Sequence, residues 1–125
     1  MGKCLIITTT NDMLRLQYDN IVYITSDGNY SQFLLSGGDM RMVTVQLGQI
    51  ERLIERQLGV FGRLFIRIGK SLIINRDYIY YININQQRLE LNDKVNQKYT
   101  VQASREALKQ LKLVIEKENE GTQRQ

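Results

Sequence analysis

The sequence of 125 residues contains no histidine, no proline and no tryptophan, and its single cysteine is Cys4. Histidine is the commonest general base near neutral pH and the commonest metal ligand in proteins, so its absence removes both roles. Cys4 has no histidine partner for thiol catalysis, no second cysteine for an internal disulfide and no cysteine cluster for zinc. We therefore expect a protein that is not an enzyme and that binds no metal or other cofactor.

Glycine-rich phosphate motifs and long apolar runs are also missing. Gly37 and Gly38 are followed by Asp39 and Met40, which indicates a hairpin turn rather than a phosphate-binding loop. No apolar run approaches the roughly 18 residues of a membrane span. The apolar patch within residues 1–7 is too short for a signal peptide. The sequence therefore predicts a cytoplasmic protein with no membrane partner.

Positive charge is concentrated in the second half of the chain. Residues 1–62 hold five Lys/Arg and six Asp/Glu, whereas residues 63–112 hold ten and four, a local net charge of +6. Residues 113–125 have a net charge of −1. A positive patch attracts polyanions, because neutralised phosphates release their counterions. The alternative explanation is a basic face that is merely solvated.

Short β-favouring runs alternate with turn residues along most of the chain, as at Asp27-Gly28-Asn29. There is no β-α-β alternation, no internal repeat and no proline-rich or serine-rich linker. This pattern predicts one mostly-β domain built from hairpins. The expected strands are residues 5–9, 13–17, 21–25, 30–35, 40–45, 65–68, 72–74, 78–84, 88–91 and 98–101.

Two segments have helical periodicity instead. Apolar residues recur at helical spacing from Leu47 to Leu58, and Gly59 is expected to end this helix in a left-handed conformation. Ser104 is expected to cap a second helix. From Glu116 on, the chain is polar and is expected to be frayed. Residues 1–125 are therefore interpreted as a single domain with its core in residues 11–115.

The segment Phe65–Ile79, FIRIGKSLIINRDYI, carries the most specific pattern. It combines a β-rich run, the basic break Gly69-Lys70-Ser71, a second apolar run and a turn at Asn75-Arg76-Asp77. This constellation resembles the core signature of the LytTR DNA-binding domain, the output domain of bacterial two-component response regulators. An ordinary buried hairpin is the alternative. Further matches are Ile21-x-Tyr23-Ile24, the helix from Leu47 and Val101-x-x-Ser104-Arg105, so the resemblance spans residues 11–115.

The resemblance implies an elongated set of small antiparallel sheets with two helices, which presents loops to successive major grooves of DNA. Three places are implied to carry contacts. They are the loop Gly28–Ser31, which includes Asn29 and Tyr30, the corner Gly69-Lys70 before Ser71, and Arg105. The family often has a histidine where Gly69 stands, so a contact through imidazole is lost here and the target site is expected to differ.

The chemistry of each candidate differs. Arg105 offers a planar fork for guanine O6 and N7, and Lys70 offers a mobile charge for a phosphate or a minor-groove edge. Asn29 can read adenine, or simply occupy a left-handed turn position. Arg67 is expected to reach a phosphate or a carboxylate at the sheet edge. Ser71, although part of the predicted site, is expected like Asn75 to hold loop backbone.

We interpret the chain as a sequence-specific duplex-DNA-binding domain that regulates transcription. It is expected to bind directly repeated half-sites as two copies, with a receiver domain or a sensor kinase pathway as possible further partners. One alternative is a β-rich module for single-stranded nucleic acid, in which aromatic residues stack on bases. The cluster Tyr78, Tyr80 and Tyr81 argues against it, because it suggests strand packing. The other alternative is a protein-interaction domain that binds no DNA.

Overall fold

The computed structural model describes residues 3–123 and contains ten strands and two α-helices within them. The strands are β1 (Cys4–Thr8), β2 (Met13–Gln17), β3 (Ile21–Asp27), β4 (Tyr30–Leu35), β5 (Met40–Val43), β6 (Phe65–Ile68), β7 (Leu72–Asn75), β8 (Ile79–Asn83), β9 (Arg88–Asn92) and β10 (Lys98–Gln102). The helices are α1 (Leu47–Leu58) and α2 (Arg105–Gln123), and 3₁₀ turns occupy η1 (Tyr18–Asn20), η2 (Gly59–Leu64) and η3 (Arg76–Tyr78). The mostly-β fold class predicted from the sequence is confirmed.

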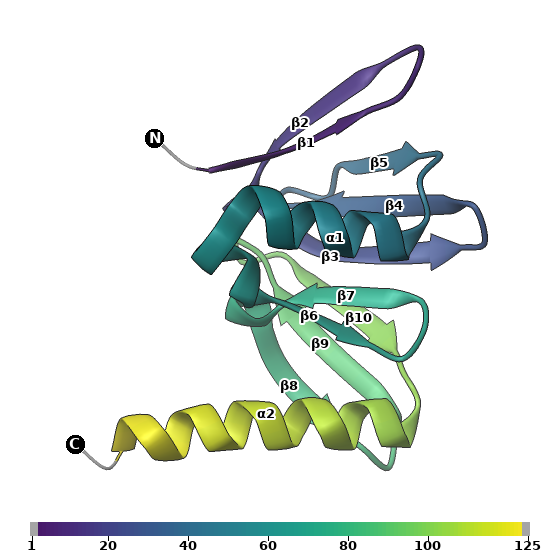
Figure 1. Ribbon diagram of the computed structural model, residues 1–125. Coiled ribbons are helices and arrows are strands. Elements are labelled where there is room, and N and C mark those ends of the chain that lie inside the picture. The colour runs from purple at the N-terminus through teal and green to yellow at the C-terminus, as the bar shows by residue number, and fades with distance from the viewer. Residues whose placement is uncertain (1–2, 124–125) are drawn as a thin grey trace.

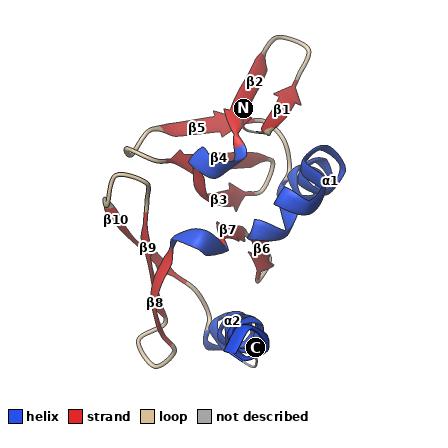
Figure 2. Ribbon diagram, turned by 90° about the vertical axis from the view of Figure 1, so that its left-hand side faces the viewer, coloured by secondary structure: helices blue, strands red, loops and turns tan. Residues whose placement is uncertain are grey.

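The strands form three antiparallel sheets (Figure 1). The β1–β2 hairpin stands at the top, and below it lies a five-stranded sheet in the order β5-β4-β3-β7-β6. A three-stranded sheet, β10-β9-β8, and helix α2 complete the lower half of the molecule. Figure 2 shows the same succession after a quarter turn, so the domain is an elongated stack of small sheets.

The five-stranded sheet separates two hydrophobic clusters. Ile50 and Ile54 of α1 pack with Phe33 and Ile73 on one face. Leu108 and Leu111 of α2 pack on the opposite side in a cluster that includes Leu72 and Ile74. Because side chains alternate between the two faces of a strand, β7 supplies both clusters and is apolar at consecutive positions. This double burial explains the continuous run at the centre of the signature segment.

Several local features differ from what the sequence predicts; the strands expected at residues 40–45 and 78–84, for example, are shorter, at Met40–Val43 and Ile79–Asn83. Gly59 has the expected positive φ of +57°, but its ψ of −125° lies outside the left-handed helical region. The sequence predicts a frayed tail from Glu116, and in the structure helix α2 continues past this residue to Gln123. Lys112 pairs with Glu116 one turn along the helix, and Arg76 of η3 forms an ion pair with Glu118, so this part of the helix has one internal ion pair and one to the rest of the domain. Residues 124–125 of the expected tail lie outside the described residues.

Candidate nucleic-acid interface

The predicted contact segments lie along one edge of the domain, on the right-hand side of Figure 1. We call this the loop edge; it comprises the β3–β4 turn at residues 28–29, the β6–β7 turn at 69–71, the segment 103–105 before and at the start of α2, and the β8–β9 turn at 84–87. Strand β7 is antiparallel to both β3 and β6, so β3 and β6 end at the same edge of their sheet. The strand order thus brings together turns that are about 40 residues apart in the sequence.

The β3–β4 turn is formed by Gly28, whose φ is +65°, and by Asn29. The Asn29 side-chain oxygen accepts a hydrogen bond from Nε2 of Gln46 at 3.3 Å, just before α1. Ser31 is fully buried, and its hydroxyl donates to the Val45 carbonyl at 2.6 Å. Tyr30 is 49% exposed. Asn29 and Tyr30 are thus exposed on a turn that is held against residues 45–46, just before α1.

The β6–β7 turn is held by main-chain and guanidinium contacts. Gly69 has φ +61°, a conformation that side chains disfavour. One guanidinium nitrogen of Arg67 donates to the Lys70 carbonyl at 2.8 Å, and the other lies 3.0 Å from the Glu51 carboxylate. The carboxylate that Arg67 reaches therefore belongs to α1 and not to the sheet edge. Arg67 positions the turn, and the Lys70 side chain is exposed beyond it.

The Asn75 side chain holds backbone as expected, whereas no hydrogen bond of the Ser71 hydroxyl is found among the described residues. Asn75 is buried; its Nδ2 donates to the Ile21 carbonyl at 3.0 Å, and its Oδ1 accepts from the Asp77 N–H at 3.0 Å. The role expected for Asn75 is therefore confirmed. For Ser71 it is the main-chain carbonyl that accepts, from the Ser26 N–H at 3.0 Å. The Ser71 residue is exposed at the loop edge.

Arg105 is the first residue of α2. Ser104 caps this helix as predicted, because its hydroxyl accepts from the Ala107 N–H at 3.1 Å. A guanidinium nitrogen of Arg105 donates to the Asn85 carbonyl at 3.3 Å, so the side chain reaches toward the β8–β9 turn. Glu106 lies 3.9 Å from Lys109 and is not the partner of Arg105. Arg105 is exposed, and no other hydrogen bond of its guanidinium is found among the described residues.

Most of the positive charge in residues 63–112 is already paired. Six of the ten Lys/Arg in this range form ion pairs with carboxylates; they are Arg67, Arg76, Arg88, Lys94, Lys109 and Lys112. Among the described residues, no carboxylate lies within ion-pair distance of Lys70 or Arg105. The net charge of the region therefore overstates what is available to a ligand, and two of the available cations lie on the loop edge.

The tyrosine cluster is divided between packing and solvent. The Tyr78 hydroxyl donates to the Asp19 carbonyl, as expected for a packed side chain. Tyr80 and Tyr81 are 60% and 43% exposed, and Nζ of Lys98 lies 5.0 Å from the centre of the Tyr80 ring. The interpretation of all three as strand packing was therefore wrong for Tyr80 and Tyr81. A bulge between Ile79 and Tyr81 shifts the register of β8 and accounts for two adjacent exposed rings.

A model of the LytTR DNA-binding domain family matches residues 11–116. This match covers the signature segment and every segment of the loop edge. The chain belongs to the LytTR DNA-binding domain family. It is accordingly a DNA-binding domain of transcription regulation, and the family is not a catalytic one.

The fold agrees with that assignment. The solved LytTr DNA-binding domain of a proposed methyl-accepting/DNA response regulator from Bacillus cereus is similar, with a TM-score of 0.61 at 15% sequence identity. The alignment covers 92% of this chain and 98% of that one. No curated protein matches the chain. No helix within residues 3–123 is long and apolar enough to cross a bilayer, and no group of three potential metal ligands occurs there.

Three residues at this edge were not singled out from the sequence. Gln46 contacts Asn29, Glu51 pairs with Arg67, and the Asn85 carbonyl holds Arg105. The sequence carried a partial signal for two of them, because Gln46 precedes a predicted helix and Asn85 stands in a predicted turn. Glu51 lies on the polar face of α1, and only the tertiary structure brings it to Arg67.

Proposed function

We propose that this LytTR domain recognises specific duplex sequences by inserting its loop-edge segments into successive major grooves. Two copies occupy directly repeated half-sites, with little contact between free monomers. The observation that carries the proposal is that the segments containing Asn29, Lys70 and Arg105 meet at one edge, with both cations free of carboxylate partners among the described residues. Phosphate contacts then fix the register, and base contacts supply the specificity.

The residues divide this work by their chemistry. Arg105 reads a guanine through its planar fork, and Asn29 reads an adenine through its amide. Lys70 contacts backbone phosphate, because a single mobile charge carries little base information. Tyr30 and Ser71 contribute further contacts beside these residues. Arg67 supports DNA binding indirectly, because it holds the β6–β7 turn that carries Lys70.

In cells, we propose that the domain is the output of a two-component pathway. A receiver domain or a sensor kinase supplies the signal, as the family assignment suggests. The similar solved domain comes from a proposed response regulator of Bacillus cereus, which supports this class of pathway. Phosphorylation of the receiver then controls how many LytTR domains are able to bind the repeated half-sites.

In vitro selection from a random duplex pool tests this proposal. We expect enrichment of a motif repeated about one or two helical turns apart, since successive half-sites must present the same face. The two half-sites are expected in direct orientation. A pool that yields an inverted repeat, or no motif, would contradict the proposed arrangement.

A second candidate function follows from the exposed rings of Tyr80 and Tyr81 beside Lys98. Aromatic rings with adjacent cations can stack on the bases of single strands. This candidate predicts that single-stranded DNA competes with duplex, and that Tyr80→Ala and Tyr81→Ala weaken binding. The duplex proposal predicts no such competition, so one filter-binding series separates the two functions.

A further inference from the structure

The β8–β9 turn lies directly against the start of α2. The Arg105 side chain donates to the Asn85 carbonyl at 3.3 Å, and the Ala103 N–H donates to the Gln87 carbonyl at 3.3 Å. These two contacts join residues about 15 to 20 positions apart in the sequence. Arg105 and the β8–β9 turn therefore lie side by side on the loop edge.

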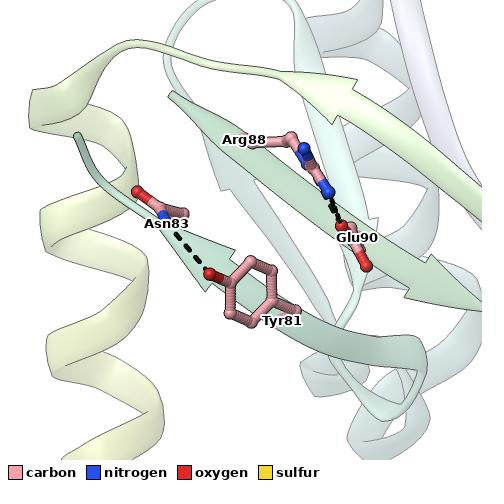
Figure 3. Close-up of polar contacts among 4 residues, drawn as sticks. All are labelled: Tyr81, Asn83, Arg88 and Glu90. Carbon is pink, nitrogen blue, oxygen red and sulfur yellow. Dashed lines mark hydrogen bonds and ion pairs between the residues drawn. The ribbon is translucent and has the colours of Figure 1, made fainter. Parts of the chain in front are cut away.

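Internal hydrogen bonds fix the shape of this turn. Asn83 donates through Nδ2 to the Tyr81 hydroxyl at 3.0 Å, as Figure 3 shows, and its Oδ1 accepts from the Gln86 N–H at 2.9 Å. Gln87 has φ +54°, and its N–H donates to the Ile84 carbonyl at 3.1 Å. The Gln86 side chain thus projects from a backbone that is already ordered before any ligand binds.

Glutamine side chains line a hollow of about 380 Å³ between this turn and α2. Its lining residues are Gln86, Gln87, Gln102, Ala103 and Ser104. Gln86 and Gln102 are exposed, and neither side chain has a hydrogen-bond partner among the described residues. The nearby cation Arg88 is bound to Glu90 on β9, as Figure 3 shows, so the hollow offers amides rather than charge.

We propose that this hollow is a further base-reading site, in which the amides of Gln86 and Gln102 recognise an adenine next to the guanine contacted by Arg105. The inference rests on the proposed duplex recognition and adds a specificity element to it. A glutamine amide can donate to adenine N7 and accept from adenine N6, a pair of bonds that no other base offers in the major groove. The ordered turn reduces the entropy that such a contact costs on binding.

The test exploits the isosteric change from glutamine to glutamate. A glutamate in the same place has no donor for adenine N7 but accepts from cytosine N4. In selections with Gln86→Glu and Gln102→Glu, we expect at least one variant to exchange adenine for cytosine at a single position of each half-site. Competition with the two duplexes should show a relative preference shifted by roughly tenfold or more.

The control is Gln17→Glu, because Gln17 is exposed at the end of β2 and lies outside the loop edge. It adds the same charge, and we expect its selected motif to match that of the wild type. A circular dichroism melt of each variant confirms that the fold is retained. Gln86→Ala and Gln102→Ala add no charge, and at least one should relax the adenine preference.

The outcomes distinguish failure of the base-reading hollow from failure of duplex recognition itself. If the wild type selects a repeated motif and all hollow variants select the same motif, the base-reading site is refuted while duplex recognition stands. Weaker binding with an unchanged motif has the same meaning, since it indicates a phosphate contact only. If the wild type selects no duplex motif, the proposed function itself fails.

Discussion

The carboxylate of Asp93 accepts a hydrogen bond from the backbone N–H of Gly37 at 2.8 Å, across 56 residues of sequence. The same carboxylate accepts from the Tyr99 hydroxyl at 2.8 Å and from the N–H groups of Val95 and Gln97 at 2.9 Å. Asp93 is only 5% exposed, so all of its hydrogen-bonding capacity is used inside the protein. This residue ties the β9–β10 turn of the lower sheet to the β4–β5 turn of the central sheet.

Replacing Asp93 with asparagine should destabilise the domain. An asparagine can supply one acceptor oxygen, but its NH₂ group would face main-chain donors that then lack a partner. The free energy of unfolding should fall by about 1–3 kcal/mol. Urea denaturation of both proteins measures this loss. Asp39→Asn is the control, since Asp39 is exposed and lies 3.7 Å from an exposed Arg41, and it should change stability little.

The contribution of Asp93 should depend on pH. Burial alone would raise the pKa of this carboxyl, but the hydrogen bonds from Gly37, Gln97, Tyr99 and Val95 together lower it below its ordinary value. Burial and the bond to Asp93 raise the pKa of Tyr99 to about 12, so the phenol remains a donor at neutral pH. Because the pKa of Asp93 is lower in the folded state than in the unfolded state, its ionised carboxylate stabilises the fold at pH values above the unfolded-state pKa. This stabilisation is lost as the pH falls through the folded-state pKa. The difference in free energy of unfolding between wild type and Asp93→Asn should therefore become smaller as the pH is lowered. A difference that grows at low pH would contradict this role.

Replacing Glu51, the partner of Arg67, tests whether Arg67 acts by positioning the β6–β7 turn or only through its charge. The two roles predict opposite changes in DNA affinity. Glu51→Gln removes a negative charge, so simple electrostatics predicts tighter DNA binding. If Arg67 acts by holding the β6–β7 turn, the same change should weaken duplex binding, by about 1 kcal/mol or roughly fivefold. Fluorescence anisotropy at fixed salt measures the affinity. Glu55→Gln, one turn along α1 and without an ion pair among the described residues, should leave binding unchanged or slightly tighter.

Truncating Arg105 should change the base preference of the domain, whereas truncating Lys70 should lower its affinity for all duplexes. Arg105→Ala should cost about 1–3 kcal/mol on the preferred duplex and relax the choice of base at one position. Lys70→Ala should weaken all duplexes about equally and reduce the salt dependence by about one unit of slope. Competition between matched and mismatched duplexes tests both variants. Arg63→Ala is the control for charge alone, because Arg63 precedes β6 at the end away from the loop edge. Equal weakening of matched and mismatched sites by Arg105→Ala would assign Arg105 to phosphate.

Binding to the preferred duplex should fall steeply with salt. Contacts with about four to six phosphates imply a log–log slope of roughly −4 to −5. Titrations at several potassium chloride concentrations measure this slope. A flat response would mean that the basic half of the chain is only a solvated face, with its charges satisfied within the protein.

The sequence alone determined the elements of this domain, because turn residues and hydrophobic periodicity act locally. The expected strands 13–17, 30–35 and 65–68 and the helix from Leu47 to Leu58 coincide with β2, β4, β6 and α1. The signature segment by itself also indicates the LytTR family. Its order of residue types is specific even though each type alone is common.

Only the tertiary structure decided which of these elements meet. Strand alternation specifies which face of a strand is buried, but it does not specify the neighbouring strand, so the order β5-β4-β3-β7-β6 could not be read from the sequence. The same holds for the pairing of Arg67 with Glu51 and for the contact of Arg105 with Asn85. Such contacts join residues 16 to 20 positions apart and depend on how helices pack on the sheets. The local sequence pattern therefore determines the strands, turns and helices. Long-range packing of their apolar faces determines which turns meet to form the loop edge.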